Sequence, residues 1–176
     1  STTMGKNVAM VVGQRLGKSL LELGGNNAII ISAEADLNIA IRGSVFGAIG
    51  TAGQRCTTTR RLIIHDSIYP VVKEKLVAAY SQIKIGNPLE STNHMGPLID
   101  QQAVTNYLKA IKACEEAGGR FIVKGGVLEG AGYESGCYVK PCIAEALPHF
   151  QIVQHETFAP ILYVMKYATL EEAIAI

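Results

Sequence analysis

The chain has 176 residues, of which 48% are hydrophobic and 18% are charged, and its net charge is +1. This length and apolar content are typical of one domain with a substantial core, or of one domain with part of another. A near-neutral charge without basic runs argues against nucleic-acid binding. No apolar stretch reaches the roughly 18 residues of a membrane span, and the N-terminal residues lack the apolar centre of a signal peptide.

Segments of helical and of strand periodicity alternate along the whole chain. Helices are predicted over residues 1–16, 36–50, 68–83 and 100–117, and a capping box at 169–172 begins another. Strands are predicted over residues 19–23, 26–32, 62–64, 121–123 and 161–165. The continuous apolar run at 26–32 predicts a strand covered on both faces. The alternation predicts an α/β fold with a largely parallel sheet and flanking helices.

Four cysteines occur in the chain, and none of them is paired as C-x-x-C: Cys56, Cys114, Cys137 and Cys142. No histidine lies at zinc-finger spacing from them, so no metal site is predicted. We expect free thiols, and the spacing leaves a disulfide open as an alternative.

The most informative stretch is residues 53–59, where Cys56 lies between a glycine-rich turn and an apolar strand. Arg55 precedes the sulfur, and Arg60 and Arg61 follow it. Nearby positive charge favours the thiolate, which is the nucleophilic form of cysteine, and the flanking glycines let the backbone approach a ligand. This predicts covalent catalysis by Cys56. The alternative is a small buried hydrophobic residue in a polar turn.

Glu22 is a second candidate, because a carboxylate among leucines is costly unless it is paired or takes part in chemistry. A solvent-facing edge position is the alternative. Glu22, Cys56 and Glu156 each lie in a short motif. The three motifs are Leu-Glu-Leu-Gly-Gly at 21–25, Gly-Gln-Arg-Cys at 53–56 and Glu-Thr-Phe-Ala-Pro at 156–160. In this order, and over essentially the whole chain, they resemble the aldehyde dehydrogenase superfamily. Residues 24–28 and 54–58 are most similar to its members that oxidise α-aminoadipic semialdehyde.

The resemblance implies a two-stage reaction on an aldehyde substrate. Cys56 would attack the aldehyde carbonyl, and its own backbone N–H would help to hold the oxyanion. Hydride transfer to the cofactor would leave a thioester on Cys56, and Glu22 would activate the water that hydrolyses it. The family's other oxyanion donor, an asparagine, would come from a motif before Ser1.

The cofactor implied by the resemblance is NAD, with NADP as the alternative. Glu156 would bind the hydroxyls of the nicotinamide ribose, Phe158 would pack near the ring, and Leu23 would lie beside the nicotinamide amide. Ser1 would face the cofactor phosphates at a helix N-terminus, where N–H groups favour anions. Arg55 could bind a carboxylate at the far end of the substrate, or it could serve only the cysteine and its loop.

The resemblance also predicts how the chain is organised. Residues 1–23 would end an NAD-binding domain, and residues 24–176 would form part of a catalytic domain of a longer, homo-oligomeric protein. We expect this protein in the cytoplasm, or in the mitochondrial matrix of a eukaryote, acting in lysine degradation without nucleic-acid or membrane partners. Two alternatives are a CoA-acylating relative, which Glu22 argues against, and a catalytically silent piece, because these residues alone are expected to be inactive.

Overall fold

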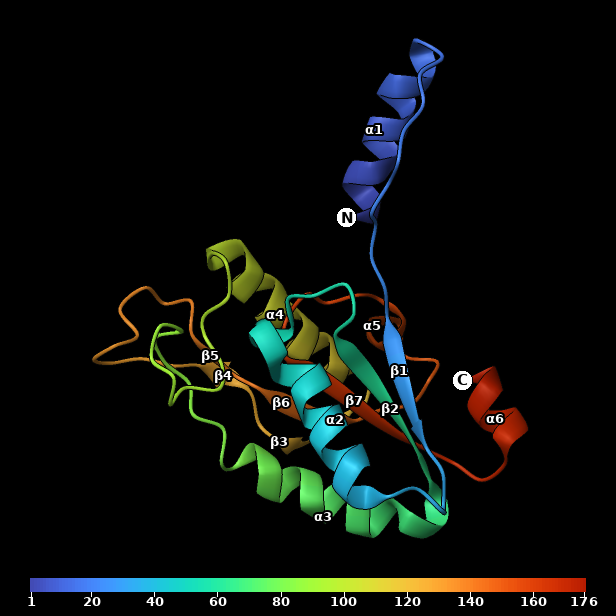
Figure 1. Ribbon diagram of the computed structural model, residues 1–176, viewed down its shortest axis with the longest axis vertical. Coiled ribbons are helices and arrows are strands. Elements are labelled where there is room, and N and C mark those ends of the chain that lie inside the picture. The colour runs from blue at the N-terminus through green and yellow to red at the C-terminus, as the bar shows by residue number, and fades with distance from the viewer.

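The computed structural model describes residues 1–176, and its centre is a twisted sheet (Figure 1). The strands are β1 (Asn27–Ile31), β2 (Thr59–His65), β3 (Arg120–Val123), β6 (Cys142–Glu145) and β7 (Ile161–Tyr167), with a separate pair made of β4 (Gly126–Val127) and β5 (Val139–Lys140). The sheet has the order β1-β2-β7-β6-β3. The pairings are parallel except for β3 against β6. The predicted α/β fold with a largely parallel sheet is therefore confirmed.

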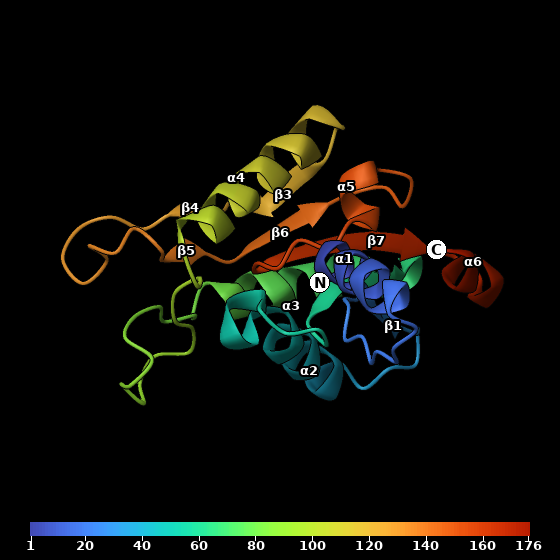
Figure 2. The ribbon, with the colours of Figure 1, turned by 90° about the horizontal axis from the view of Figure 1, so that it is seen from above.

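The chain also forms helices, and some of them cover the two faces of this sheet. They are α1 (Thr2–Gln14), α2 (Leu37–Ile49), α3 (Tyr69–Tyr80), α4 (Gln101–Glu116), α5 (Gln151–Gln154) and α6 (Leu170–Ala175), with short 3-10 helices η1 (Gly50–Gly53) and η2 (Asp66–Ile68). Figure 2 shows α2 and α3 on one face and α4 and α5 on the other. None of these helices has both the length and the apolar character that crossing a bilayer requires.

Local hydrogen bonds explain where the longer helices begin. The side chains of Asp36 and Asp100 accept from the backbone N–H groups of Asn38 and Ala103, at 2.8 and 2.7 Å. Each bond satisfies an N–H group that has no partner within its own helix. The predicted starts of α2 and α4 are therefore confirmed, and Thr169 caps α6 in the same way.

Two of the strand predictions need correction. Residues 19–23 form no strand, because a strand needs a hydrogen-bonded partner and the backbone of these residues bonds to no other segment of the chain. Strand β1 is not covered on both faces. Ile31 is buried, but Ile30 is 44% exposed, because β1 is an edge strand that pairs only with β2.

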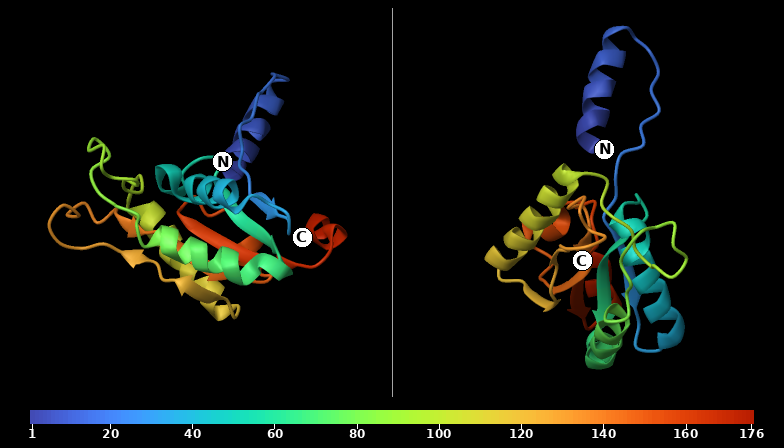
Figure 3. Two further views of the ribbon diagram at one scale, coloured as in Figure 1. Left: turned by 60° about the horizontal axis from the view of Figure 1, so that its bottom comes forward. Right: turned by 90° about the vertical axis from the view of Figure 1, so that its left-hand side faces the viewer.

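Helix α1 and the irregular segment after it project from the body of the molecule (Figure 3). Gly5 is the only buried residue of α1, and the side chain of Leu23 packs directly over it. The return segment then joins the sheet at β1, so residues 22–25 lie between α1 and the body. The predicted domain boundary after residue 23 falls in this segment and stays a prediction.

Glu145, at the end of β6, forms ion pairs with two basic side chains, Lys73 and Arg120. Its carboxylate accepts hydrogen bonds from Tyr69 and Lys73, each at 2.9 Å, and from Arg120. Partial burial acts to raise the pKa of Glu145, but the bonds from Lys73, Arg120 and Tyr69 outweigh it and lower the pKa to about 2. The ionised carboxylate is therefore strongly favoured in the folded protein.

We expect Glu145→Gln to lower the free energy of unfolding by about 1–2 kcal/mol at pH 7, a figure that allows for solvent screening of a partly exposed group. Because the folded pKa lies below the unfolded one, the stabilisation is complete above about pH 5 and disappears as the pH falls towards 2. Urea unfolding across this pH range measures the difference. Glu116→Gln, at an exposed pair with Lys112 on α4, is the matched control and should change little. A pH-independent loss at Glu145 would contradict the argument.

Candidate active site

Cys56 follows a turn with an unusual backbone. Helix α2 ends at Ile49, and η1 then places Thr51, Ala52 and Gly53 in the left-handed region, with φ values of 53°, 53° and 72°. This conformation is costly for a β-branched residue such as Thr51. At Gly53 a side chain is excluded as well, because a Cβ atom would lie 2.4 Å from the backbone of Ala159. The Cys56 turn therefore packs closely against the loop before β7.

The turn is held by hydrogen bonds that leave Cys56 itself open. The side-chain amide of Asn27 donates to the carbonyl oxygens of Cys56 and Thr58, at 2.6 and 3.1 Å. The N–H of Arg55 donates to the hydroxyl of Thr58 at 3.1 Å. The N–H of Cys56 makes no hydrogen bond within the chain, and the residue is exposed. Cys56 therefore presents a thiol and a free backbone donor together.

The other three cysteines lie in different surroundings, and all four thiols are free, as predicted. Cys114 and Cys142 are buried. Burial, and secondarily the charge of Glu115, raises the pKa of the Cys114 thiol to about 11, and burial raises that of Cys142 as well. Cys137 is half-buried beside Gln101. Cys56 is therefore the one exposed thiol. No group of three or more His, Cys, Asp or Glu side chains is placed to hold a metal ion.

Glu156 lies in the loop between α5 and β7 and meets the segment that precedes β1. Its Oε1 atom accepts from the N–H of Gly25 at 3.2 Å. A Cβ atom on Gly24 would lie only 2.3 Å from the Oε2 atom of Glu156, so the carboxylate takes the space that a side chain at position 24 would need. A Cβ atom on Gly25 would lie 3.1 Å from the carbonyl oxygen of Cys56. The two glycines therefore let Cys56 and Glu156 approach the same short segment.

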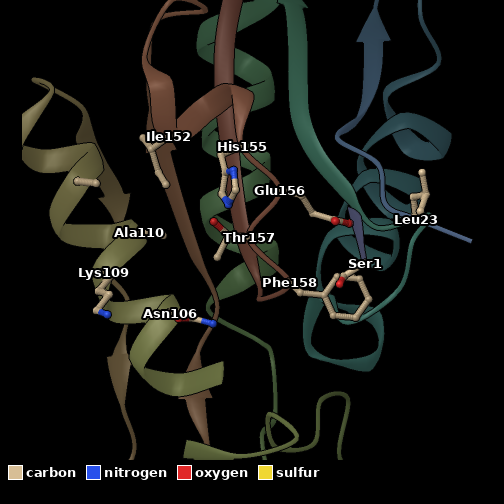
Figure 4. A pocket seen from close by; sticks show the side chains of 11 residues that line it. Ser1, Leu23, Asn106, Lys109, Ala110, Ile152, His155, Glu156, Thr157 and Phe158 are labelled. Atoms are coloured by element: carbon tan, nitrogen blue, oxygen red, sulfur yellow. The ribbon is translucent and has the colours of Figure 1, made fainter. Parts of the chain in front are cut away.

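A cavity of about 670 Å³ opens beside Glu156. It is lined by the four residues that the sequence predicts to bind the cofactor: Ser1, Leu23, Glu156 and Phe158. In Figure 4 these four lie on one side of the cavity, and residues of α4 and α5 lie on the other. The structure thus brings together residues that are up to 157 positions apart in the sequence. The roles assigned to them stay predictions.

Sequence reasoning missed four polar residues that line the same cavity: Asn106 and Lys109 on α4, and His155 and Thr157 after α5. It also missed Asn27 and gave Arg60 no role of its own. The periodicity of α4 could have indicated Asn106 and Lys109, because they lie three residues apart and therefore share a helix face. No local signal in the sequence shows which face meets the cavity.

The two remaining predicted site residues do not line this cavity. Glu22 is exposed in the irregular segment, which agrees with the solvent-facing alternative, although no strand forms there. Arg55 is exposed, and its guanidinium carbon lies 5.7 Å from the centre of the Phe46 ring. Both Arg55 and Phe46 line a separate cavity of about 510 Å³ between α2 and α3. Residues of the Cys56 turn, Thr51 and Arg55, therefore line a cavity other than the one beside Glu156.

A family model described as the aldehyde dehydrogenase family matches residues 1–176. The chain belongs to this family. A Pisum sativum relative named aldehyde dehydrogenase family 7 member A1 is 49% identical over 176 residues, which cover 100% of this chain and 34% of the relative. The alpha-aminoadipic semialdehyde dehydrogenase of Bos taurus is 48% identical, with 99% of this chain and 32% of the relative covered.

Solved structures of aldehyde dehydrogenases share this fold. Betaine aldehyde dehydrogenase from Staphylococcus aureus, in complex with NAD+, matches with a TM-score of 0.95 at 26% identity, over 99% of this chain and 35% of that one. The family predicted from the three motifs is therefore confirmed. The closer similarity of the chain to α-aminoadipic semialdehyde dehydrogenase, or antiquitin, is confirmed at the level of sequence. The chain spans about a third of the length of these aldehyde dehydrogenases.

Proposed function

We propose that the complete protein is an NAD(P)-dependent aldehyde dehydrogenase that oxidises an aldehyde to a carboxylic acid through a thioester on Cys56. One observation carries this proposal. An exposed thiol with a free backbone N–H lies on a turn that contacts the Gly24–Gly25 segment, and this segment in turn holds Glu156 beside a cavity of about 670 Å³. The nucleophile and the pocket for a second reactant therefore contact the same short segment, Gly24–Gly25.

The residues around the larger cavity fit a nicotinamide dinucleotide. Glu156 offers a carboxylate that can accept hydrogen bonds from ribose hydroxyls, and Phe158 offers an aromatic face beside it. Lys109 places a positive charge on the opposite wall, and Ser1 lies at the N-terminus of α1. When it is bound, the cofactor supplies the hydride acceptor that aldehyde oxidation requires. The NAD+ complex of the S. aureus enzyme supports this choice, and NADP is the alternative.

The chemistry assigned to this chain begins at Cys56. The thiolate attacks the aldehyde carbon, and the carbonyl oxygen becomes an oxyanion that the free N–H of Cys56 can bind. Loss of hydride from the same carbon restores the carbonyl and leaves a thioester. Glu22 then takes a proton from water, the resulting hydroxide adds to the thioester, and the thiolate leaves with release of the carboxylic acid. The exposed position of Glu22 allows it to reach water.

The substrate that we propose is α-aminoadipic semialdehyde, on the strength of the similarity to the bovine enzyme of that name. This aldehyde carries a carboxylate, and Arg55 next to Cys56 offers a planar donor that binds carboxylates bidentately. The cavity lined by Arg55 and Phe46 would admit the far end of such a substrate. With this proposal we keep the expectations of a homo-oligomer, of a role in lysine degradation, and of the cytoplasm or mitochondrial matrix as its location.

The test is aldehyde-dependent NADH formation by the complete protein. We expect oxidation of α-aminoadipic semialdehyde without any requirement for CoA, since a CoA-acylating relative would need CoA to release the acyl group. Arg55→Ala should raise KM for the amino-acid aldehyde by about 10-fold or more, because a charge-assisted hydrogen bond is lost. KM for an unsubstituted aliphatic aldehyde of similar length should change much less.

Arg15 is the control for Arg55, because it is an exposed arginine that follows α1 and lines neither cavity. Arg15→Ala should leave the ratio of the two KM values near that of the wild type. Equal losses on both aldehydes in Arg55→Ala would mean that Arg55 serves the cysteine or its loop, and the substrate proposal would then fall back on sequence similarity. No NADH formation with any aldehyde would contradict the proposed function.

A further inference from the structure

Arg60 is the buried charge at the centre of the site, and the chemistry above gives it no part. It lies on β2 and is 2% exposed, although arginine is rarely buried unless it is paired. Burial lowers the pKa of the Arg60 guanidinium below its ordinary value, and the neighbouring Glu156 carboxylate opposes that shift. Such a residue is costly to bury, so its contacts should explain why it lies there.

The contacts of Arg60 divide between two loops. On the side of the Cys56 turn, its Nη1 and Nη2 atoms both donate to the carbonyl oxygen of Gly53 at 3.3 Å, and Nη2 donates to that of Arg55 at 3.2 Å. On the side of the loop before β7, Nη1 donates to the carbonyl oxygen of Thr157 at 2.6 Å, and Nη2 donates to Glu156 Oε1 at 3.4 Å. One guanidinium therefore bonds to both loops at once.

The aromatic residue of the cavity completes this set of contacts. The guanidinium carbon of Arg60 lies 5.3 Å from the centre of the Phe158 ring, within the range of a cation–π interaction. The Nε atom of Arg60 is buried without a hydrogen-bond partner. Arg60 therefore leaves one donor unpaired, while it contacts Glu156 and Phe158 of the cavity and the two carbonyl groups that precede Cys56.

We propose that Arg60 is a positioning residue that couples occupancy of the Glu156 cavity to the placement and reactivity of Cys56. The proposal rests on the proposed function, since it takes a nicotinamide dinucleotide as the occupant of that cavity. A ligand that contacts Glu156 or Phe158 would shift the Arg60 guanidinium, which donates hydrogen bonds to the Gly53 and Arg55 carbonyl groups just before Cys56. Coupling of this kind is reciprocal, so the state of the Cys56 turn must also affect affinity at the cavity.

Lysine cannot replace arginine in this role. Four acceptors on two loops are bonded by two nitrogens of one planar group, and a lysine ammonium has a single nitrogen with three donors. Arg60→Lys therefore keeps the positive charge but cannot hold both loops. The substitution separates the geometric role of Arg60 from its charge.

The experiment measures two quantities in the complete protein: the Kd for NAD, and the rate of Cys56 alkylation by iodoacetamide with and without saturating NAD. In the wild type we expect NAD to change the alkylation rate by about fivefold or more. In Arg60→Lys we expect NAD binding about 10- to 100-fold weaker, and an alkylation rate that saturating NAD no longer changes. Arg120→Lys is the matched control, because Arg120 also pairs with a glutamate but lies on β3, outside the cavity.

The outcomes distinguish this inference from the function on which it rests. A wild-type protein that neither binds NAD nor changes its alkylation rate overturns both. A wild-type response that persists unchanged in Arg60→Lys overturns only the role of Arg60. If circular dichroism shows that Arg60→Lys does not fold, Glu156→Gln replaces it, because this variant retains the three carbonyl contacts and removes the carboxylate end. The NAD effect on Cys56 should then weaken, and its persistence at saturating NAD would overturn the proposal.

Discussion

Cys56→Ser in the complete protein should lower the rate of aldehyde oxidation by about 10³-fold or more, because a serine hydroxyl is not ionised at neutral pH and no adjacent base activates it. NAD affinity should stay within about threefold of the wild type, since Cys56 does not line the Glu156 cavity and the substitution changes one atom. The initial rate of NADH formation measures the first quantity, and a fluorescence titration with NAD measures the second.

The control for this variant is Cys137→Ser, at a half-buried thiol in the loop before β5. It should keep the wild-type rate. A limiting amount of iodoacetamide should modify Cys56 before Cys114 and Cys142, which are buried and have raised thiol pKa values. Activity that survives complete modification of Cys56 would show that another residue is the nucleophile.

Glu22→Gln should separate the two halves of the reaction. The amide cannot accept a proton from water, so thioester hydrolysis should slow by about 10²- to 10⁴-fold, the usual cost of losing a general base. Hydride transfer precedes this step and should remain. We expect a rapid burst of NADH of about one equivalent per active site, followed by slow turnover, and stopped-flow absorbance resolves the two phases.

Because Glu22 is exposed, the substitution should change activity without a large change in stability. A surface substitution usually changes the free energy of unfolding by less than about 0.5 kcal/mol. Glu34→Gln, at an exposed carboxylate in the turn after β1, controls for the loss of charge alone. Steady-state turnover equal to that of the wild type would remove Glu22 from the mechanism. A large loss of stability would indicate instead that the carboxylate has a structural partner.

The sequence was sufficient for the elements whose signals are local. The caps at Asp36 and Asp100 and the apolar periodicity behind them predict α2 and α4, and the structure has both. The run at 26–32 predicts a strand, but its exposed Ile30 follows from its place at the edge of the sheet. Strand β6 was missed because four residues beside a proline carry little periodicity. Its position between β7 and β3 is a property of the whole sheet.

The same distinction holds for the site. Short motifs indicated Cys56 and Glu156, because each lies in a distinctive local pattern. Arg60 lies in the same stretch, yet its importance depends on carbonyl groups at Gly53 and Thr157, which are far apart in the sequence. The two alternatives for Glu22 could not be decided from the sequence for a related reason. The leucines on either side of it are only partly covered by this chain, at 37% and 43% exposed, and Glu22 itself is exposed.

The place of β7 in the sheet has a consequence for how the chain acquires its structure during synthesis. It follows the other four strands of the sheet in the sequence and is the middle strand of the five, pairing with β2 on one side and β6 on the other. Until residues 161–167 have left the ribosome, β1–β2 and β3–β6 are two separate half-sheets with open apolar edges. Such long-range pairing is slow and prone to aggregation, so a nascent chain should depend on chaperones until β7 joins the two halves.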